Sequence, residues 1–183
     1  IALLTDHALI AIRDPFGIRP LVIGQREESY VVASETCALD AVGAEFIRDV
    51  EPGEIVVFDD EGMRSLKQSE KTHSNTCSFE FIYFSRPDSV IDGVDVYASR
   101  TRAGARLFEE SPVEADLVSG VPDSGVVAAM GYAEASHLPY AQTLIKNKYV
   151  GRSFIAPSQE LRERAVQVKL NVLKSNVAGK RII

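Results

Sequence analysis

Short apolar runs alternate with turn residues along the first third of the chain. Gly, Pro and Asp residues at positions 14–17 and 51–53 punctuate the pattern. Brief runs rich in β-branched residues between such turns favour strands. They occupy residues 8–12, 21–23, 30–33 and 54–58. A short helix is expected at residues 34–41, and Ser34 could cap it. The pattern predicts the end of an antiparallel sheet domain.

The pattern changes after residues 67–76, a polar stretch without periodicity that is typical of a linker. Apolar residues at helical spacing predict helices at 96–110 and 126–136. The short, nearly continuous apolar run at residues 117–121 favours a buried parallel strand. Further strands are expected at residues 140–145 and, because its side chains alternate, at residues 168–173.

The last part of this pattern allows two interpretations. A single helix over residues 158–172 fits the spacing, but the alternation in VKLNV favours a short helix followed by a strand. Strands interleaved with helices imply a parallel sheet. We therefore expect an α/β chain with an α+β part, divided into residues 1–70 and 71–183.

Charge is distributed unevenly along the chain, whose net charge is −6. Residues 1–70 hold 6 Lys and Arg against 14 Asp and Glu, whereas residues 140–183 hold 9 against 2. A local basic excess in an acidic protein favours an anionic ligand, with a merely solvated face as the alternative. No aromatic-interleaved basic repeat or zinc spacing indicates nucleic acid. No stretch of about 18 apolar residues indicates a membrane span. Two cysteines 40 positions apart are typical of a reducing cytoplasm.

The sequence GVPDSG at residues 120–125 follows an apolar strand and opens a helix. Backbone N–H groups and the helix dipole make such a turn attractive to phosphate, and ligands gather at the carboxyl ends of parallel strands. Asp123 and Ser124 are therefore candidate ligand residues. The alternative is that one of them only caps the helix.

Lys146, Lys148 and Arg152 surround Tyr149 and Gly151. Three cations within seven residues, next to a glycine, suit a mobile loop that closes over a polyphosphate. The alternative is a basic surface that only serves solubility.

Six sequence blocks, in their order along the chain, resemble the amidophosphoribosyltransferase family. They are RDPFGIRPL, ASETCALD, RDVEPGE, CSFEFIYFSRPDS, GVPDSGVVAAMGYAEA and KNKYVGRSFIAPSQELR. The resemblance covers nearly all 183 residues. It implies the end of an amino-terminal-nucleophile glutaminase domain, an αββα sandwich, followed by the first half of a type I phosphoribosyltransferase domain. Because both chain ends lie in apolar, strand-like runs, we expect the chain to be an internal part of a longer enzyme.

The resemblance implies a glycosyltransferase of purine biosynthesis. Family members convert glutamine and phosphoribosyl pyrophosphate to 5-phosphoribosylamine, glutamate and pyrophosphate, are inhibited by purine nucleotides and form homotetramers. The resemblance places no catalytic residue in this chain, so these residues alone are expected to be inactive. The alternatives are a different phosphoribosyltransferase and a non-catalytic module that binds phosphoribosyl pyrophosphate.

Site roles follow from the same resemblance. Ser124 matches a residue that helps to hold magnesium, and Asp123 an acidic residue of the phosphoribosyl site. Lys146, Lys148, Tyr149 and Arg152 match the loop that closes over phosphoribosyl pyrophosphate. Cys77 matches a ligand of a [4Fe–4S] cluster in one branch of the family. A lone cysteine is otherwise most often a small buried hydrophobe, because a cluster needs about four thiolates.

Overall fold

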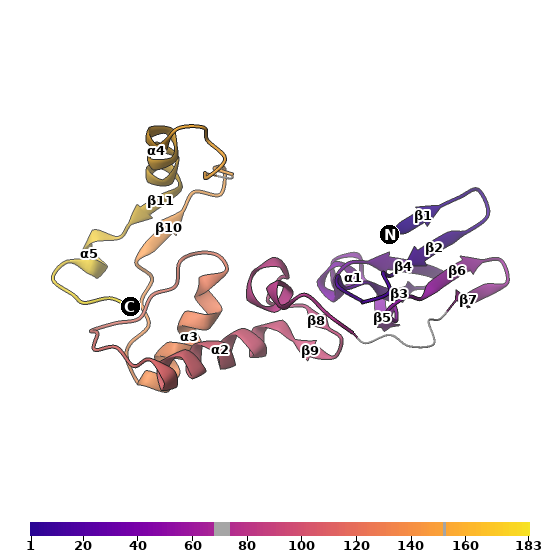
Figure 1. Ribbon diagram of the computed structural model, residues 1–183, viewed down its shortest axis with the longest axis horizontal. Helices are drawn as coiled ribbons and strands as arrows, with labels where there is room; N and C mark the ends of the chain where they lie inside the picture. The colour runs from indigo at the N-terminus through magenta and orange to yellow at the C-terminus, as the bar shows by residue number, and fades with distance from the viewer. Residues whose placement is uncertain (68–73, 152) are drawn as a thin grey trace. The chain divides into compact units, whose positions relative to one another are not determined.

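Antiparallel strands make up most of the first part of the structure. The computed structural model describes residues 1–67, 74–151 and 153–183. The chain divides into two units, Ile1–Ser99 and Arg100–Ile183. Among its described residues, the first unit holds a four-stranded antiparallel sheet of order β1-β2-β6-β7, a three-stranded one of order β4-β3-β5 and a short strand pair near its end (Figure 1). The strands of the two larger sheets are β1 (Ala2–Leu4), β2 (Leu9–Ile12), β3 (Val22–Arg26), β4 (Ser29–Ala33), β5 (Glu45–Asp49), β6 (Ile55–Asp59) and β7 (Gly62–Lys67).

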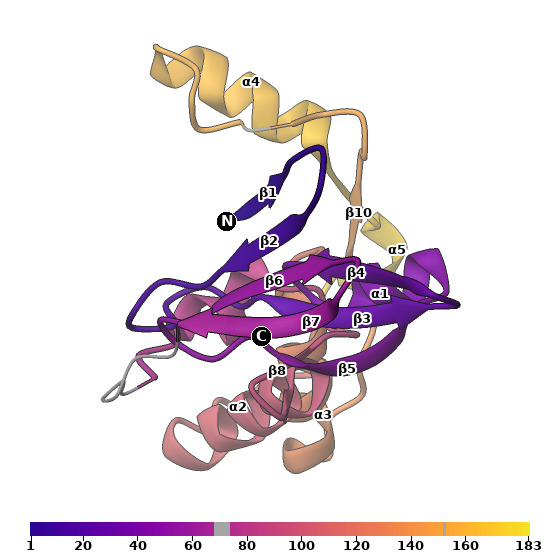
Figure 2. The same ribbon diagram turned by 90° about the vertical axis from the view of Figure 1, so that its right-hand side faces the viewer.

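Strand β3 is buried on both of its faces. Ile23 belongs to a cluster that also contains Ala11 and Val56, which are register partners in β2 and β6. Its neighbour Val22 belongs to a second cluster with Leu39 of the helix α1 (Thr36–Val42). Successive side chains of a strand point to opposite faces, so this sheet packs against the other sheet on one side and α1 on the other (Figure 2).

The strands expected at 8–12, 21–23, 30–33 and 54–58 are confirmed as β2, β3, β4 and β6. The helix expected at 34–41 is confirmed as α1, but the predicted cap is wrong. The residue at the N-cap is Glu35, not Ser34, and its side chain makes no cap hydrogen bond. Instead its carboxylate accepts hydrogen bonds from the backbone N–H of Arg86 and the hydroxyl of Ser89, both at 2.8 Å.

The first unit ends with short elements. They are a π-helix, η1 (Glu80–Phe84), a strand pair, β8 (Val90–Ile91) and β9 (Val94–Asp95), and the start of the helix α2 (Val96–Glu110). The first unit therefore extends to Ser99. The division of domains after residue 70 stays a prediction. Most of the linker predicted at 67–76 lies outside the described residues.

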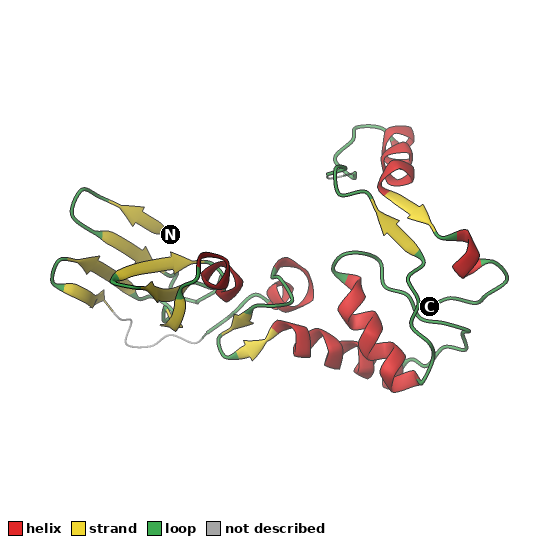
Figure 3. Cartoon of the chain, turned by 180° about the vertical axis from the view of Figure 1, so that it is seen from behind, coloured by secondary structure: helices red, strands yellow, loops and turns green. Residues whose placement is uncertain are grey.

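The second unit contains most of the helical residues (Figure 3). Its elements after α2 are α3 (Gly125–Ser136), β10 (Leu144–Lys146), α4 (Gln159–Lys169), β11 (Leu170–Val172) and α5 (Lys174–Val177). The short helix followed by a strand that VKLNV favoured is confirmed by α4 and β11.

The strands predicted in this unit are shorter than expected. Among the described residues of this unit, parallel pairing is limited to two isolated bridges, Leu117 with Ile182 and Val118 with Tyr140, and β10 pairs with β11 in antiparallel fashion. The predicted strands at 117–121 and 140–145 are thus wrong in extent. Val118 nevertheless packs with Tyr132 in a core cluster, so the apolar run marks a buried position correctly.

Helices α2 and α3 meet at two glycines. A Cβ atom on Gly104 of α2 would lie 1.8 Å from the carbonyl oxygen of Ala128, and one on Gly131 of α3 would lie 2.0 Å from that of Thr101. Real Cβ atoms do not approach backbone atoms this closely, so each helix backbone contacts the other where a side chain would stand. Only glycine fits these two positions.

Candidate functional site

The turn between the Leu117–Val118 segment and α3 is tightly built. Leu117 and Val118 are each 2% exposed, and α3 begins at Gly125. A Cβ atom on Gly120 would lie 2.5 Å from the Cα of Val126, so the chain turns back onto the first residues of the helix. The peptide bond between Pro122 and Asp123 is cis. Asp123 and Ser124 lie directly before the first residue of α3.

The structure brings together two of the residues predicted from sequence. The ammonium group of Lys146, at the end of β10, forms an ion pair with the carboxylate of Asp123. The Asp123 side chain is 75% exposed and that of Lys146 is 25% exposed, so the pair is open to solvent on the side of Asp123. An exposed pair of this kind contributes little to stability, at most about 1 kcal/mol. Its partners are available to exchange with a ligand.

Ser124 does not act as a helix cap through its side chain. It occupies the N-cap position of α3 with φ −67° and ψ −28°, and its hydroxyl accepts no cap hydrogen bond. A capping residue usually has extended backbone geometry and accepts from the N–H two or three residues later. The cap interpretation is therefore wrong for Ser124, and its hydroxyl lies beside Asp123 without a role in the helix.

A hydroxyl pair that the sequence did not indicate lies near this turn. The side-chain oxygens of Ser119 and Thr143 are 2.7 Å apart, and Thr143 is 6% exposed. The backbone N–H of Leu173 donates to the carbonyl of Thr143 at 2.8 Å. Thr143 thus ties the chain before β10 to the strand segment before the turn. No spacing signal marks this pair, because its members are 24 positions apart.

The basic loop after β10 is exposed. Tyr149 is 99% exposed, and its backbone N–H donates to the side-chain oxygen of Asn147 at 3.0 Å. The base of the loop is held by Lys169, whose carbonyl accepts from the N–H of Asn147 at 2.7 Å and whose ammonium group donates to the carbonyl of Gly151 at 3.1 Å. Lys148 is exposed, with no ion pair in the described part of the chain. Arg152 lies outside the described residues.

Cys77 is a free, partly buried thiol. Its backbone N–H donates to the carbonyl of Ile18 at 3.0 Å. Among residues 1–67, 74–151 and 153–183, no three His, Cys, Asp or Glu side chains are grouped so that they could hold a metal ion. These residues alone therefore do not fit a four-thiolate cluster. Cys37, the other free thiol, is 6% exposed.

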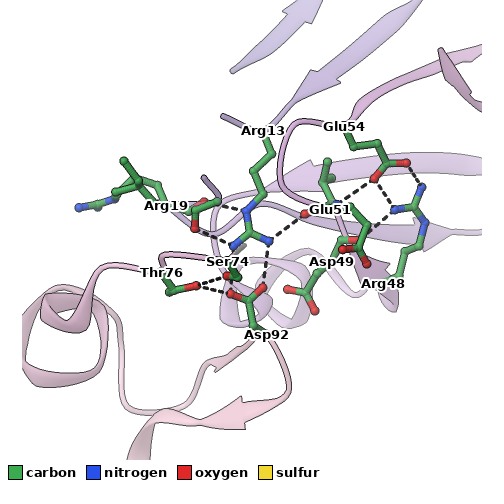
Figure 4. A network of polar contacts seen from close by, with 12 residues as sticks. Arg13, Arg19, Arg48, Asp49, Glu51, Glu54, Ser74, Thr76 and Asp92 are labelled. Carbon is green, nitrogen blue, oxygen red and sulfur yellow. Dashed lines mark hydrogen bonds and ion pairs between the residues drawn. The ribbon is translucent and has the colours of Figure 1, made fainter. Parts of the chain in front are cut away.

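A second polar cluster surrounds Arg13 in the first unit (Figure 4). Arg13 is 3% exposed and forms a two-pronged ion pair with the carboxylate of Asp92, with N–O distances of 2.9 and 3.0 Å. Its remaining N–H groups donate to three backbone carbonyls. These belong to Gly17, Arg19 and Val50. All five guanidinium donors are thus engaged.

Glu54 forms a neighbouring cluster. It is 2% exposed, and its carboxylate binds both terminal nitrogens of Arg48 at 2.8 Å. It also accepts from the backbone N–H of Glu51 and the hydroxyl of Ser65, both at 2.8 Å. Burial by itself raises the pKa of Glu54, but these hydrogen bonds outweigh it and hold the pKa below its usual value.

Acid is expected to destabilise the first unit through Glu54 and Asp92. Burial raises the pKa of Asp92, but the hydrogen bonds from Arg13 and Thr76 lower it more. A carboxyl group with a lowered pKa stabilises the fold above its unfolded pKa of about 4, and this contribution is lost as the pH falls through the folded pKa. The melting temperature should therefore decrease once the pH is lowered below about 4. The Glu54→Gln variant should have a lower melting temperature than the wild type at pH 7, and its melting temperature should depend less on pH.

Asp49 provides the matched control. Burial and the charge of Asp92 raise the pKa of Asp49, so its ionised form is unfavourable in the fold. Asp49→Asn should therefore leave the melting temperature at pH 7 unchanged or higher. A lower melting temperature for Asp49→Asn than for Glu54→Gln would contradict this account of the two clusters.

No helix in the described residues combines the length and the apolar character that crossing a bilayer requires. The structure is a mixed α/β chain, and a serine, an acidic residue and a lysine gather where a buried segment turns into a helix. Such turns are typical of α/β proteins that bind phosphorylated ligands.

Curated proteins of known function match nearly the whole chain. The chain is 52% identical over 181 residues to the amidophosphoribosyltransferase of Archaeoglobus fulgidus, covering 99% of this chain and 40% of the relative. It is 54% identical over 181 residues to that of Bacillus subtilis, covering 99% of this chain and 38% of the relative. It is 55% identical over 182 residues to the amidophosphoribosyltransferase of Synechocystis, covering 98% of this chain and 37% of the relative. No family model matches the chain.

Solved structures agree. The B. subtilis glutamine phosphoribosylpyrophosphate amidotransferase complexed with ADP and GMP superposes with a TM-score of 0.89 at 54% identity, covering 99% of this chain and 40% of that one. The structure of an allosteric regulatory enzyme of purine biosynthesis superposes with a TM-score of 0.88 at 54% identity, covering 99% of this chain and 39% of that one. The chain therefore corresponds to a segment of the amidophosphoribosyltransferases, and the family resemblance is confirmed. It spans about two-fifths of the length of these relatives.

Proposed function

We propose that the chain is part of an enzyme that makes 5-phosphoribosylamine from phosphoribosyl pyrophosphate and glutamine. In this reaction glutamine is hydrolysed to glutamate and ammonia, and the ammonia nitrogen displaces pyrophosphate from C1 of the ribose. The first unit would belong to a glutaminase domain of αββα architecture. The second would form the first half of a type I phosphoribosyltransferase domain. Identities of 52–55% over nearly the whole chain support this proposal.

The observation that carries the proposal is the arrangement of Asp123, Ser124 and Lys146 at the turn into α3. The helix N-terminus favours negative charge, and the Lys146 ammonium adds a positive charge beside it. Pyrophosphate would draw Lys146 away from Asp123, leaving the carboxylate to face the ribose. Mg²⁺ is commonly held by a few protein oxygens together with substrate phosphates, and the Ser124 hydroxyl is available for that role. Magnesium would draw electron density from the departing pyrophosphate.

The exposed loop supplies the remaining proposed contacts. Lys148, Tyr149 and Arg152 would close over the polyphosphate, and the same basic positions would contact inhibitory purine nucleotides. The high exposure of Tyr149 is consistent with a side chain that gains its contacts on ligand binding. Cys77 would bind a [4Fe–4S] cluster only together with thiolates from outside the described residues. On the basis of the family resemblance, the full-length enzyme would be a cytoplasmic homotetramer.

The proposal is tested with the full-length protein. With glutamine, phosphoribosyl pyrophosphate and Mg²⁺ it should release glutamate and pyrophosphate in equal amounts, and the isolated 183-residue chain should release neither. Pyrophosphate release with a nucleobase but not with glutamine would indicate a different phosphoribosyltransferase. Magnesium-dependent binding without turnover would indicate a non-catalytic module. Product formation by the 183 residues alone would contradict the assignment of both reactive groups to other parts of the enzyme.

A further inference from the structure

Residues 74–95, which we call the docked segment, lie along residues 13–21 of the first unit, the RDPFGIRPL block, which we call the motif. The backbone N–H of Asn75 donates to the carbonyl of Phe16 at 2.7 Å, and that of Cys77 donates to the carbonyl of Ile18 at 3.0 Å. The docked segment leads directly into α2, which begins at Val96. Its attachment therefore fixes where the chain enters that helix.

Charged side chains hold the docked segment at three further places. The first is Glu80 in η1, which is 1% exposed and forms an ion pair with Arg19 at 2.7 Å. The Arg19 guanidinium also lies 4.7 Å from the centre of the Phe84 ring. Because Glu80 is buried, its charge requires a partner such as Arg19. This contact orients η1 against the motif.

The second place is the start of α1. Glu35 accepts from the N–H of Arg86 and the hydroxyl of Ser89, and the hydroxyl of Thr36 accepts from the N–H of Val90 at 2.9 Å. These bonds join positions 51 to 54 residues apart in sequence. Glu35, at the N-cap position of α1, thus binds the docked segment instead of capping the helix.

The third place is Asp92. Its carboxylate takes two N–H groups of Arg13 and the hydroxyl of Thr76 at 2.6 Å, so it links both ends of the docked segment to the motif. Asp92 has a φ of 47°, in the left-handed region that residues other than glycine rarely occupy. All five donors of Arg13 have protein partners, so this cluster is not a ligand site.

We infer that Asp92 is a positioning residue for the use of glutamine nitrogen, an inference that rests on the proposed function. Through Arg13 and Thr76 it holds the docked segment, and with it the start of α2, in one place. In the proposed function, nitrogen is released from glutamine in one domain and used in the other, so a displaced docked segment should impair product formation from glutamine. Ammonia added to the solution reaches the ribose by diffusion, so product formation from ammonia does not depend on the position of the docked segment.

The test compares two nitrogen donors in the full-length protein. Product formation is measured with glutamine and with ammonium chloride, together with glutamate release and the melting temperature. Asp92→Asn should lower the ratio of glutamine-dependent to ammonia-dependent product by on the order of tenfold, because misplacement by about 1 Å far from the chemistry can cost up to about a hundredfold. Thr76→Val, which removes one of the three bonds, should lower the ratio in the same direction but less.

Asp59→Asn is the matched control. Asp59 also pairs with an arginine, Arg64, at 2.5 Å, but it lies in the β6–β7 hairpin outside the docked segment. In the Asp59→Asn variant, the ratio of glutamine-dependent to ammonia-dependent product should stay at the wild-type value. An unchanged ratio in folded Asp92→Asn, or an equal fall in Asp59→Asn, would overturn the inference. If Asp92→Asn does not fold, the same comparison is made with Thr76→Val, and an unchanged ratio of glutamine-dependent to ammonia-dependent product in that variant would overturn the inference. A wild-type protein that makes no product from either donor would instead overturn the proposed function, and the inference with it.

Discussion

Replacing Ser124 by alanine in the full-length protein should lower magnesium-dependent use of phosphoribosyl pyrophosphate by at least about tenfold, because loss even of a group that only orients a metal ligand typically costs about 10- to 100-fold. Glutamine hydrolysis should change little, because it takes place in a different domain of the proposed enzyme. The melting temperature should not fall, since the Ser124 hydroxyl makes no cap hydrogen bond in α3. Steady-state kinetics with varied phosphoribosyl pyrophosphate and a thermal melt measure these effects.

The chain offers a matched control in Ser158. This serine caps α4, and its side chain accepts from the N–H of Leu161 at 3.3 Å. Ser158→Ala should therefore cost about 1 kcal/mol of stability, the usual value of a lost cap. Ser124→Ala is expected to show the opposite combination, with unchanged stability and impaired transfer. A lowered melting temperature with normal transfer kinetics would show that Ser124 serves the helix after all.

Replacing Gly131 by alanine should destabilise the second unit by about 2 kcal/mol or more. The new Cβ atom would lie 2.0 Å from the carbonyl oxygen of Thr101, so α2 and α3 would have to move apart. Overpacking of this kind typically costs about 1–3 kcal/mol, and a backbone atom cannot move aside as a flexible side chain can. The gain of about 1 kcal/mol in helix propensity offsets only part of this cost. Denaturant unfolding followed by circular dichroism measures the difference.

Gly125→Ala in the same helix is the control, because the nearest atom to its Cβ would be 3.8 Å away. It should leave the stability unchanged or raise it slightly. Combining Gly131→Ala with Gly104→Ala should cost less than the two single changes together, since the first already separates the helices. Full additivity, or a Gly131→Ala protein as stable as the Gly125→Ala protein, would show that the two helices do not meet at these glycines.

Local pattern was sufficient for the elements that carry a regular apolar face. The strands β2, β3, β4 and β6 were predicted because their buried residues alternate or run continuously. By contrast, β5 does not follow from the pattern, because its two apolar residues, Phe46 and Ile47, are adjacent rather than alternating and lie between charged residues. The strand predicted at 117–121 was too long, because in the described part of the chain only its first two residues find a parallel partner. A strand's extent depends on what pairs with it, and local sequence does not contain that information.

In the candidate site, too, local sequence predicts single positions but not the contacts between distant ones. The position of Asp123 and Ser124 at a strand-to-helix turn could be predicted, because turn residues follow an apolar run and precede a helical pattern. The ion pair with Lys146 could not, because it joins positions 23 apart and depends on how β10 is placed. The bond between Arg13 and Asp92 joins positions 79 apart, and neither residue stands out in its own neighbourhood.

The burial of β3 on both faces has a consequence for the evolution of the chain. Val22 faces one core and Ile23 the other, so sliding β3 by a single residue would exchange their places and those of every side chain along it. A residue inserted or deleted within β3 would do the same. Changes of length in this region should therefore be confined to the connections outside the strand, such as the turn at Glu27, while β3 itself keeps a constant length among homologous chains.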